Sequence, residues 1–329
     1  MATLARIATI CQSGNYHNTI EGNNGEMLKR LDLALKLKPD LVCLPESFSS
    51  ASVPRENVAL IAESIPGPTT DLFARRAQQH HCYILCPVFT YREEHYLNTV
   101  VVIDRTGKIL GFYDKIHPVT STSDYTQFEQ GVTPGSNTPV FDMDFGRIGI
   151  QICFDALFPD SWTELSCKGA RIVFWPSAYN GGFPLQVYAW IHHYYVVSSV
   201  STEKSRIIDP CGSILAETDN QVNVIWRDIN LDYAVCHNDF NYSIPDRILA
   251  VYPGKVEIRT HWDAGHFLLE PLDPGVTVAG LQKEFGFITV QEYALFHQNA
   301  YNELRAGNAT TPQKVAHGDR PMYQKEIYG

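Results

Sequence analysis

The spacing of hydrophobic and polar positions predicts strands and helices that alternate along the first two-thirds of the chain. Short apolar runs bounded by turn residues predict strands at residues 4–11, 41–44, 83–89, 171–175, 196–201 and 225–229. Apolar residues at helical spacing predict helices at residues 23–38, 69–81, 160–167 and 185–195. Paired runs around tight turns predict two hairpins, 98–104 with 108–113 and 140–143 with 147–152. Strands, helices and hairpins mixed in this order indicate an α/β fold with a mixed sheet.

The pattern changes after about residue 238. One helix is predicted at residues 290–305, followed by a polar tail, and the spacing of apolar residues gives no sign of a separate core. We therefore predict a main domain at residues 1–237. Residues 238–329 are interpreted as an extension that packs on the main domain or on a partner subunit, without being an independent domain.

Composition and charge argue against nucleic acids and anionic membranes as partners. The chain has 329 residues, is 44% hydrophobic, and carries a net charge of −10. Nucleic acids and anionic membranes attract basic surfaces, so neither is expected as a partner. No apolar stretch is long enough to predict a membrane helix, and the N-terminus lacks the pattern of a signal peptide.

The eight cysteines are scattered, mostly within apolar runs. This distribution favours thiols in a reducing cytosol over a disulfide framework, so a cytoplasmic location is expected. Cys82 and Cys86 have no second cysteine pair to complete a zinc site. The paired histidines at 80–81 and 192–193 lack metal-ligand spacing, and no metal is expected.

Three residues at the ends of apolar runs are candidates for chemistry. Cys153 follows a run in which Ile148, Ile150 and Ile152 alternate, as in a half-buried strand, although most single cysteines are small buried hydrophobes. Glu46 directly follows Leu-Val-Cys-Leu-Pro, where we expect a half-buried carboxylate, which needs a partner or a raised pKa. Lys115 follows a strand-like run, although a lone lysine is most often a surface charge. If they meet, they supply a nucleophile, a base and a cation.

These motifs, in this order, resemble the Glu-Lys-Cys triad of the nitrilase, or carbon-nitrogen hydrolase, superfamily. Glu46 lies in LPE, Lys115 in YDKIH and Cys153 in GIQICFD. A fourth match is EQGVTPG, in which Glu129 resembles the second acid of the family. On the residues alone, Glu129 reads as a solvent-exposed acid in the polar loop at 121–137. The resemblance runs from about residue 5 to about residue 232.

The resemblance implies a fold and a mechanism. The fold would be a four-layer αββα sandwich of two mixed sheets with helices outside. Glu46 would be the base, Cys153 the nucleophile, and Lys115 with the backbone N–H of Phe154 the oxyanion donors, assisted by Glu129. No cofactor is implied, and the partner is a small-molecule amide or ureide. The family also implies a homodimer or a higher homo-oligomer.

The residues after the nucleophile favour an amidase or carbamoylase branch. True nitrilases of the family typically read Cys-Trp-Glu, whereas this chain reads Cys-Phe-Asp at residues 153–155. Carbamoylases often place an arginine shortly after the cysteine to bind a substrate carboxylate, and residues 155–158 contain none. This argues against a carboxylate bound in that way. Four polar and aromatic residues are candidates for either pocket lining or core packing: Tyr179, Asn180, Phe183 and Trp190.

Three alternatives remain open from the sequence. The chain could hydrolyse nitriles with the same fold, or be a catalytically idle interaction protein that keeps the fold. A papain-like protease would require a histidine base, for which His117 and His192 are the candidates. An intact set of Glu46, Lys115 and Cys153 argues against an idle protein.

Overall fold

The computed structural model describes residues 4–313, and the chain divides into two compact units. The larger unit runs from Ala5 to Ile229, and the smaller one contains the chain from Asn230 onward.

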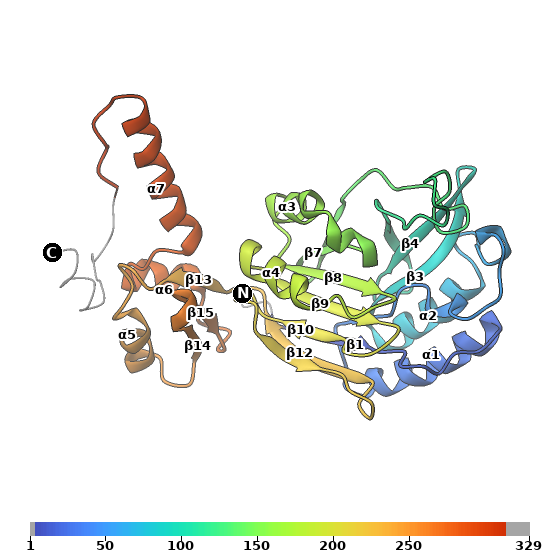
Figure 1. Ribbon diagram of the computed structural model, residues 1–329. Helices are drawn as coiled ribbons and strands as arrows, with labels where there is room; N and C mark the ends of the chain where they lie inside the picture. The colour runs from blue at the N-terminus through green and yellow to red at the C-terminus, as the bar shows by residue number, and fades with distance from the viewer. Residues whose placement is uncertain (1–3, 314–329) are drawn as a thin grey trace. The chain divides into compact units, whose positions relative to one another are not determined.

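The larger unit consists of two six-stranded sheets and four α-helices (Figure 1). The first sheet contains β1 (Leu4–Ile10), β2 (Leu41–Cys43), β3 (Tyr83–Arg92), β4 (His95–Ile103), β5 (Ile109–Asp114) and β12 (Val224–Asn230). The second contains β6 (Val140–Met143), β7 (Gly146–Ile150), β8 (Ile172–Ser177), β9 (Tyr195–Val200), β10 (Arg206–Ile208) and β11 (Ile214–Glu217). The helices are α1 (Ile20–Leu35), α2 (Pro68–His80), α3 (Pro159–Cys167) and α4 (Phe183–His192).

Both sheets are mixed, as predicted. The strand orders are β12-β1-β2-β3-β4-β5 and β11-β10-β9-β8-β7-β6. In the first sheet β1, β2 and β3 run parallel, and in the second sheet β7, β8 and β9 do. A hairpin forms one edge of each sheet, β4 with β5 in the first and β6 with β7 in the second. Side chains of one sheet hydrogen-bond to the backbone of the other. Ser199 of β9 donates to the carbonyl of Ile10 at 2.7 Å, and Thr9 of β1 donates to that of Ser198 at 2.7 Å.

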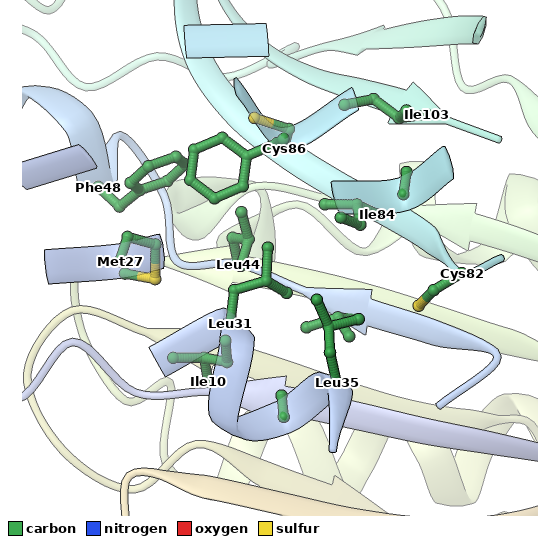
Figure 2. Packing of buried hydrophobic residues seen from close by; sticks show 14 of the residues in the cluster. Ile10, Met27, Leu31, Leu35, Leu44, Phe48, Cys82, Ile84, Cys86 and Ile103 are labelled. Atoms are coloured by element: carbon green, nitrogen blue, oxygen red, sulfur yellow. The ribbon is translucent and has the colours of Figure 1, made fainter. Parts of the chain in front are cut away.

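Each sheet packs a separate helical layer on its outer face. The first core joins α1 and α2 to β1–β4, and Figure 2 shows Leu31 and Leu35 of α1 close to Ile10 and Ile84. The second core joins α3 and α4 to the other sheet and is built around Trp162 and Trp175. This arrangement confirms the four-layer αββα sandwich. Because both faces of the inner strands are covered, strands such as β3 and β8 are buried at nearly every residue.

The strand that leads to Cys153 differs from the half-buried strand that its alternation suggested. Ile148 and Ile150 are fully buried, and Gly149 between them is buried as well. A Cβ atom on Gly149 would lie 2.9 Å from both methyl carbons of Leu165. The second face of β7 is therefore covered closely by α3, and the glycine is needed for that approach.

The smaller unit has a core of its own, which the sequence pattern did not reveal. Its sheet has the order β13-β15-β14, from Ala234–His237, His266–Pro271 and Val256–His261. Its helices are α5 (Ile244–Val251), α6 (Val278–Phe285) and α7 (Val290–Arg305). Buried residues of the sheet and of α5 and α6, such as Phe267, Ile248 and Leu281, form one cluster. The unit begins at Asn230 rather than at residue 238. It stays a prediction that this part of the chain packs on the main domain or on a partner subunit and is not an independent domain.

Among the described residues, no helix combines the length and the apolar character that are needed to cross a membrane.

Candidate active site

Cys153 is the first residue of a short 3₁₀ helix, Cys153–Leu157, on the sharp turn that follows β7. Its φ of 46° is in the left-handed region, which is strained for a residue with a Cβ atom. The turn is held from both sides, because Trp175 donates its Nε1–H to the carbonyl of Cys153 at 3.0 Å and Asp155 accepts the N–H of Ile152 at 2.8 Å. The backbone N–H of Phe154 has no acceptor within residues 4–313. The turn therefore presents a thiol beside an unused N–H group.

Glu46 follows β2 and is buried, with 6% of its surface exposed. Its Oε1 accepts hydrogen bonds from Lys115 Nζ at 2.8 Å and from Asn98 Nδ2 at 2.9 Å. Its Oε2 accepts the backbone N–H of Ala178 at 2.8 Å, just beyond β8. Three elements of two sheets thus fix this carboxylate.

Lys115 follows β5 and is 1% exposed, so it is not the surface charge that a lone lysine usually is. Its Nζ lies between two carboxylates, 2.8 Å from Glu46 Oε1 and 2.5 Å from Glu129 Oε1. Its backbone is also fixed, since its N–H donates to the carbonyl of Asn98 and its carbonyl accepts the N–H of Gly135, each at 2.8 Å.

Glu129 is brought into this cluster by a tight loop. It has a φ of 40°, and its N–H donates to the carbonyl of Val119 at 2.9 Å. Its carboxylate then turns inward, so that 13% of its side chain is exposed. The exposed position that the polar loop suggested is therefore not observed.

Asn98 of β4 is a member of the site that sequence reasoning missed. Its side-chain amide donates to Glu46 Oε1 and to Glu129 Oε2, each at 2.9 Å, and so joins the two carboxylates. A signal was present in the sequence, because Asn98 and Thr99 are polar residues at the head of the run Val100–Ile103. Buried polar residues in a strand require partners, and here the partners are the two acids.

The electrostatics keep the lysine charged and the cysteine protonated. Burial lowers the pKa of Lys115, but the carboxylates of Glu46 and Glu129 outweigh it and raise that pKa above its usual value. Burial and then the negative charge of Glu46 raise the pKa of Cys153 to about 12, although Lys115 opposes them. At neutral pH the site thus holds a thiol, which needs a base to become a nucleophile.

These residues line one cavity of about 460 Å³. Glu46, Lys115, Glu129 and Cys153 all reach it, together with Asn98. A cavity of this size accommodates a small organic molecule. The structure therefore brings together the four residues that were predicted from separate motifs.

Asp155 connects the nucleophile turn to the lysine segment, which the sequence did not predict. It is fully buried and accepts the hydroxyl of Tyr113 at 2.7 Å and the backbone N–H of His117 at 3.0 Å. The ring of His117 also bonds to it at 2.8 Å and stacks on Phe158. Asp155 therefore holds both sides of Lys115 against the turn that carries Cys153.

The four predicted pocket residues, by contrast, lie outside the residues that line the cavity. Phe183 is 71% exposed, Tyr179 is 44% exposed and Trp190 is 42% exposed, while Asn180 follows Tyr179 in the same loop. The ring of Tyr179 packs edge-on against Trp175, with 5.3 Å between the ring centres. Tyr179 is still near the site, since burial and then the charges of Cys153 and Glu46 raise the pKa of its hydroxyl. The candidate bases of a papain-like protease, His117 and His192, do not line the cavity either.

Comparison with known proteins agrees with the fold. The sequence model of the carbon-nitrogen hydrolase family matches residues 6–235, most of the chain. The chain belongs to the carbon-nitrogen hydrolase family. The match ends close to the start of the smaller unit, so that nearly all of this unit lies beyond the family region.

Proteins with similar sequences carry names that refer to different activities. The chain is 31% identical to a nitrilase of Pyrococcus abyssi, over 68% of this chain and 90% of the relative. It is 28% identical to a deaminated glutathione amidase of Synechocystis, over 69% of this chain and 92% of the relative. The match with the nitrilase and fragile histidine triad fusion protein of Caenorhabditis elegans, 23% identical, covers 71% of this chain but only 58% of that longer protein.

Among solved structures, an amidase from Nesterenkonia has a similar fold, with a TM-score of 0.61 at 18% identity, over 69% of this chain and 91% of that one.

Proposed function

We propose that the protein hydrolyses the C–N bond of a small, non-peptide amide or ureide through a thioester on Cys153. The observation that supports this most strongly is the position of Lys115 Nζ, which contacts both Glu46 and Glu129 in a cavity that Cys153 also lines. A buried lysine that is held by two carboxylates beside a thiol can act as a fixed positive charge that stabilises an oxyanion.

In the acylation step, Glu46 accepts the proton of Cys153 while the sulfur attacks the carbonyl carbon. The raised pKa of Cys153 makes this transfer necessary, because almost no thiolate exists at neutral pH. The oxyanion that forms is stabilised by Lys115 and by the N–H of Phe154. Glu46 then returns the proton to the nitrogen, the C–N bond breaks, and ammonia or an amine leaves.

In the deacylation step, Glu46 removes a proton from water, which attacks the thioester carbon. The C–S bond breaks, a carboxylic acid is released, and Glu46 reprotonates the sulfur. Glu129 positions Lys115 and, through Asn98, Glu46. No step requires a cofactor.

Amides or ureides are favoured over nitriles by the sequence Cys-Phe-Asp and by the amidase-type relatives. Nitrile hydrolysis remains the second candidate, because one relative is named a nitrilase. A homo-oligomeric state and a cytoplasmic location stay predictions.

The test is ammonia release from a panel of small amides, N-carbamoyl compounds and nitriles, with wild type beside Cys153→Ala. We expect wild type to release ammonia from amides or ureides and Cys153→Ala to lose at least about 10³-fold in rate. Release from nitriles alone would select the second candidate. An absence of any turnover, with Cys153 unreactive towards iodoacetamide, would instead support a catalytically idle protein.

A further inference from the structure

A second cation lines the active-site cavity, and the proposed chemistry does not use it. Among the cavity-lining residues of the described chain, the cations are Lys115 and Arg55. Lys115 is occupied by two carboxylates, as shown above. Arg55 lies in the loop after Glu46 and is partly buried.

The guanidinium of Arg55 has few partners. Within residues 4–313 its Nε is buried and makes no hydrogen bond, and Nη1 reaches the carbonyl of Ser50 only at a long 3.4 Å. No ion pair to Arg55 is formed in that part of the chain, although the charges of Glu129 and Glu46 are felt at a distance. Most of its five N–H donors are therefore unused.

The position of the guanidinium is nevertheless defined. Its central carbon lies 5.1 Å from the centre of the Phe89 ring, which also lines the cavity. A cation–π contact of this kind restricts where the guanidinium lies and uses none of its N–H donors. A fixed guanidinium with unused donors in a partly desolvated cavity is suited to a carboxylate, which it binds through two parallel hydrogen bonds.

We propose that Arg55 binds a carboxylate of the substrate, so that the substrate is an amide or ureide that also carries an acid group. This inference rests on the proposed function and narrows its substrate class. The lack of an arginine at residues 155–158 argued only against a carboxylate bound next to the nucleophile. Arg55 reaches the cavity from the loop after β2, a strand of the first sheet. A carboxylate site at Arg55 therefore does not require an arginine at residues 155–158.

The competing interpretation is that Arg55 only balances the two acids of the cavity. Glu46 and Glu129 supply two negative charges, and Lys115 with Arg55 supplies two positive ones. Under that interpretation, removing Arg55 would affect charged and neutral substrates alike, because it would act on the catalytic groups. A role in binding would affect the charged substrate alone. The comparison of the two substrate types therefore separates the interpretations.

The experiment measures kcat/KM for pairs of substrates that differ in one acid group. Each pair contains an ω-amido carboxylate or an N-carbamoyl amino acid and its neutral methyl ester or alkyl counterpart. Wild type is compared with Arg55→Gln and Arg55→Lys, and Arg75→Gln, an exposed position on α2, is the matched control. We expect the preference of wild type for the charged member to fall by about 10- to 100-fold in Arg55→Gln and partly in Arg55→Lys. The loss should lie mainly in KM.

A binding measurement keeps this test independent of turnover. Calorimetric titration of Cys153→Ala with the same carboxylates should show binding that is weakened about 10-fold or more when Arg55→Gln is added. Equal losses for charged and neutral substrates, or carboxylate binding that does not depend on Arg55, would overturn the proposal. If no compound is turned over but Arg55-dependent binding is seen, the proposed hydrolysis fails while the carboxylate site stands.

Discussion

At the scale of single residues, the site depends on the arrangement of two negative groups around one positive group. Glu46 and Glu129 both approach Lys115 Nζ, and Asn98 donates one hydrogen bond to each acid. Two carboxylates in a buried site repel each other unless donors and a cation lie between them. Asn98 therefore helps to hold the two acids close together without having to contact the substrate.

Asn98→Asp tests this arrangement with almost no change in volume. The new carboxylate would face Glu46 and Glu129 without the hydrogen bonds that the amide donates, and the site would take up a proton to relieve the repulsion. We expect kcat to fall by about 10²-fold or more, and the loss to be larger than any change in KM. Steady-state kinetics beside Asn137→Asp, an exposed control, would measure it. Full activity in Asn98→Asp would show that the amide is dispensable.

At the scale of elements, turns and loops determine which groups meet. The apolar runs predicted β1 and the two hairpins close to their observed bounds, because burial on a sheet face leaves a periodic pattern. The bounds of α7 were predicted as well, although this helix has no buried residue. Each residue of the triad follows such a run, which is why the sequence indicated Glu46, Lys115 and Cys153. The resemblance to the family then predicted that the three form one site.

Other parts of the molecule could not be predicted from local pattern. Arg55 lies in a polar loop, and its approach to the cavity depends on how that loop turns after β2. The core of the smaller unit was missed because its strands pair over a distance in the sequence, as Ala234 does with Leu269. Such pairing leaves no signal within a short window of sequence.

Gly135→Ala tests the contact between the long loop and the lysine. Gly135 donates its N–H to the carbonyl of Lys115 at 2.8 Å, and a Cβ at this position would overlap the backbone of Asp114. The loop must move away, so Lys115 loses a backbone restraint. We expect a loss of about 1–3 kcal/mol in the free energy of unfolding, with a reduced kcat.

The matched control is Gly25→Ala in the interior of α1, where nothing lies within 4 Å of the new Cβ. Alanine is the better helix former, so this variant should gain about 0.5–1 kcal/mol of stability. Denaturant unfolding of the two variants beside wild type measures both effects. An unchanged stability of Gly135→Ala would show that the loop is not held where the structure places it.

At the scale of the whole molecule, burial couples the stability of the fold to alkaline pH. Burial raises the pKa of Cys82 and of Cys153 from 9.0 to about 12, and it raises the pKa of Tyr113 as well. The unfolded chain releases these protons first. Their contribution to stability is thus fully present below pH 9 and is lost as the pH rises towards 12.

We therefore expect the melting temperature to fall steadily between pH 8.5 and about 10.5, measured by calorimetry at constant ionic strength. Cys82→Ala should flatten this dependence, since it removes one of the buried thiols. Cys167→Ala, at an exposed cysteine, should leave it unchanged. A melting temperature that stays constant over this range would contradict the burial of these groups.

The central claim is that Cys153 carries the acyl group during hydrolysis. Its most direct test is mass spectrometry of the protein after rapid acid quench during turnover of the best amide or ureide from the panel. The account predicts a thioester on the peptide that contains Cys153, absent in Cys153→Ala and absent from the exposed Cys167. Ammonia release by Cys153→Ala at the wild-type rate, or an acyl group found only on another residue, would contradict it.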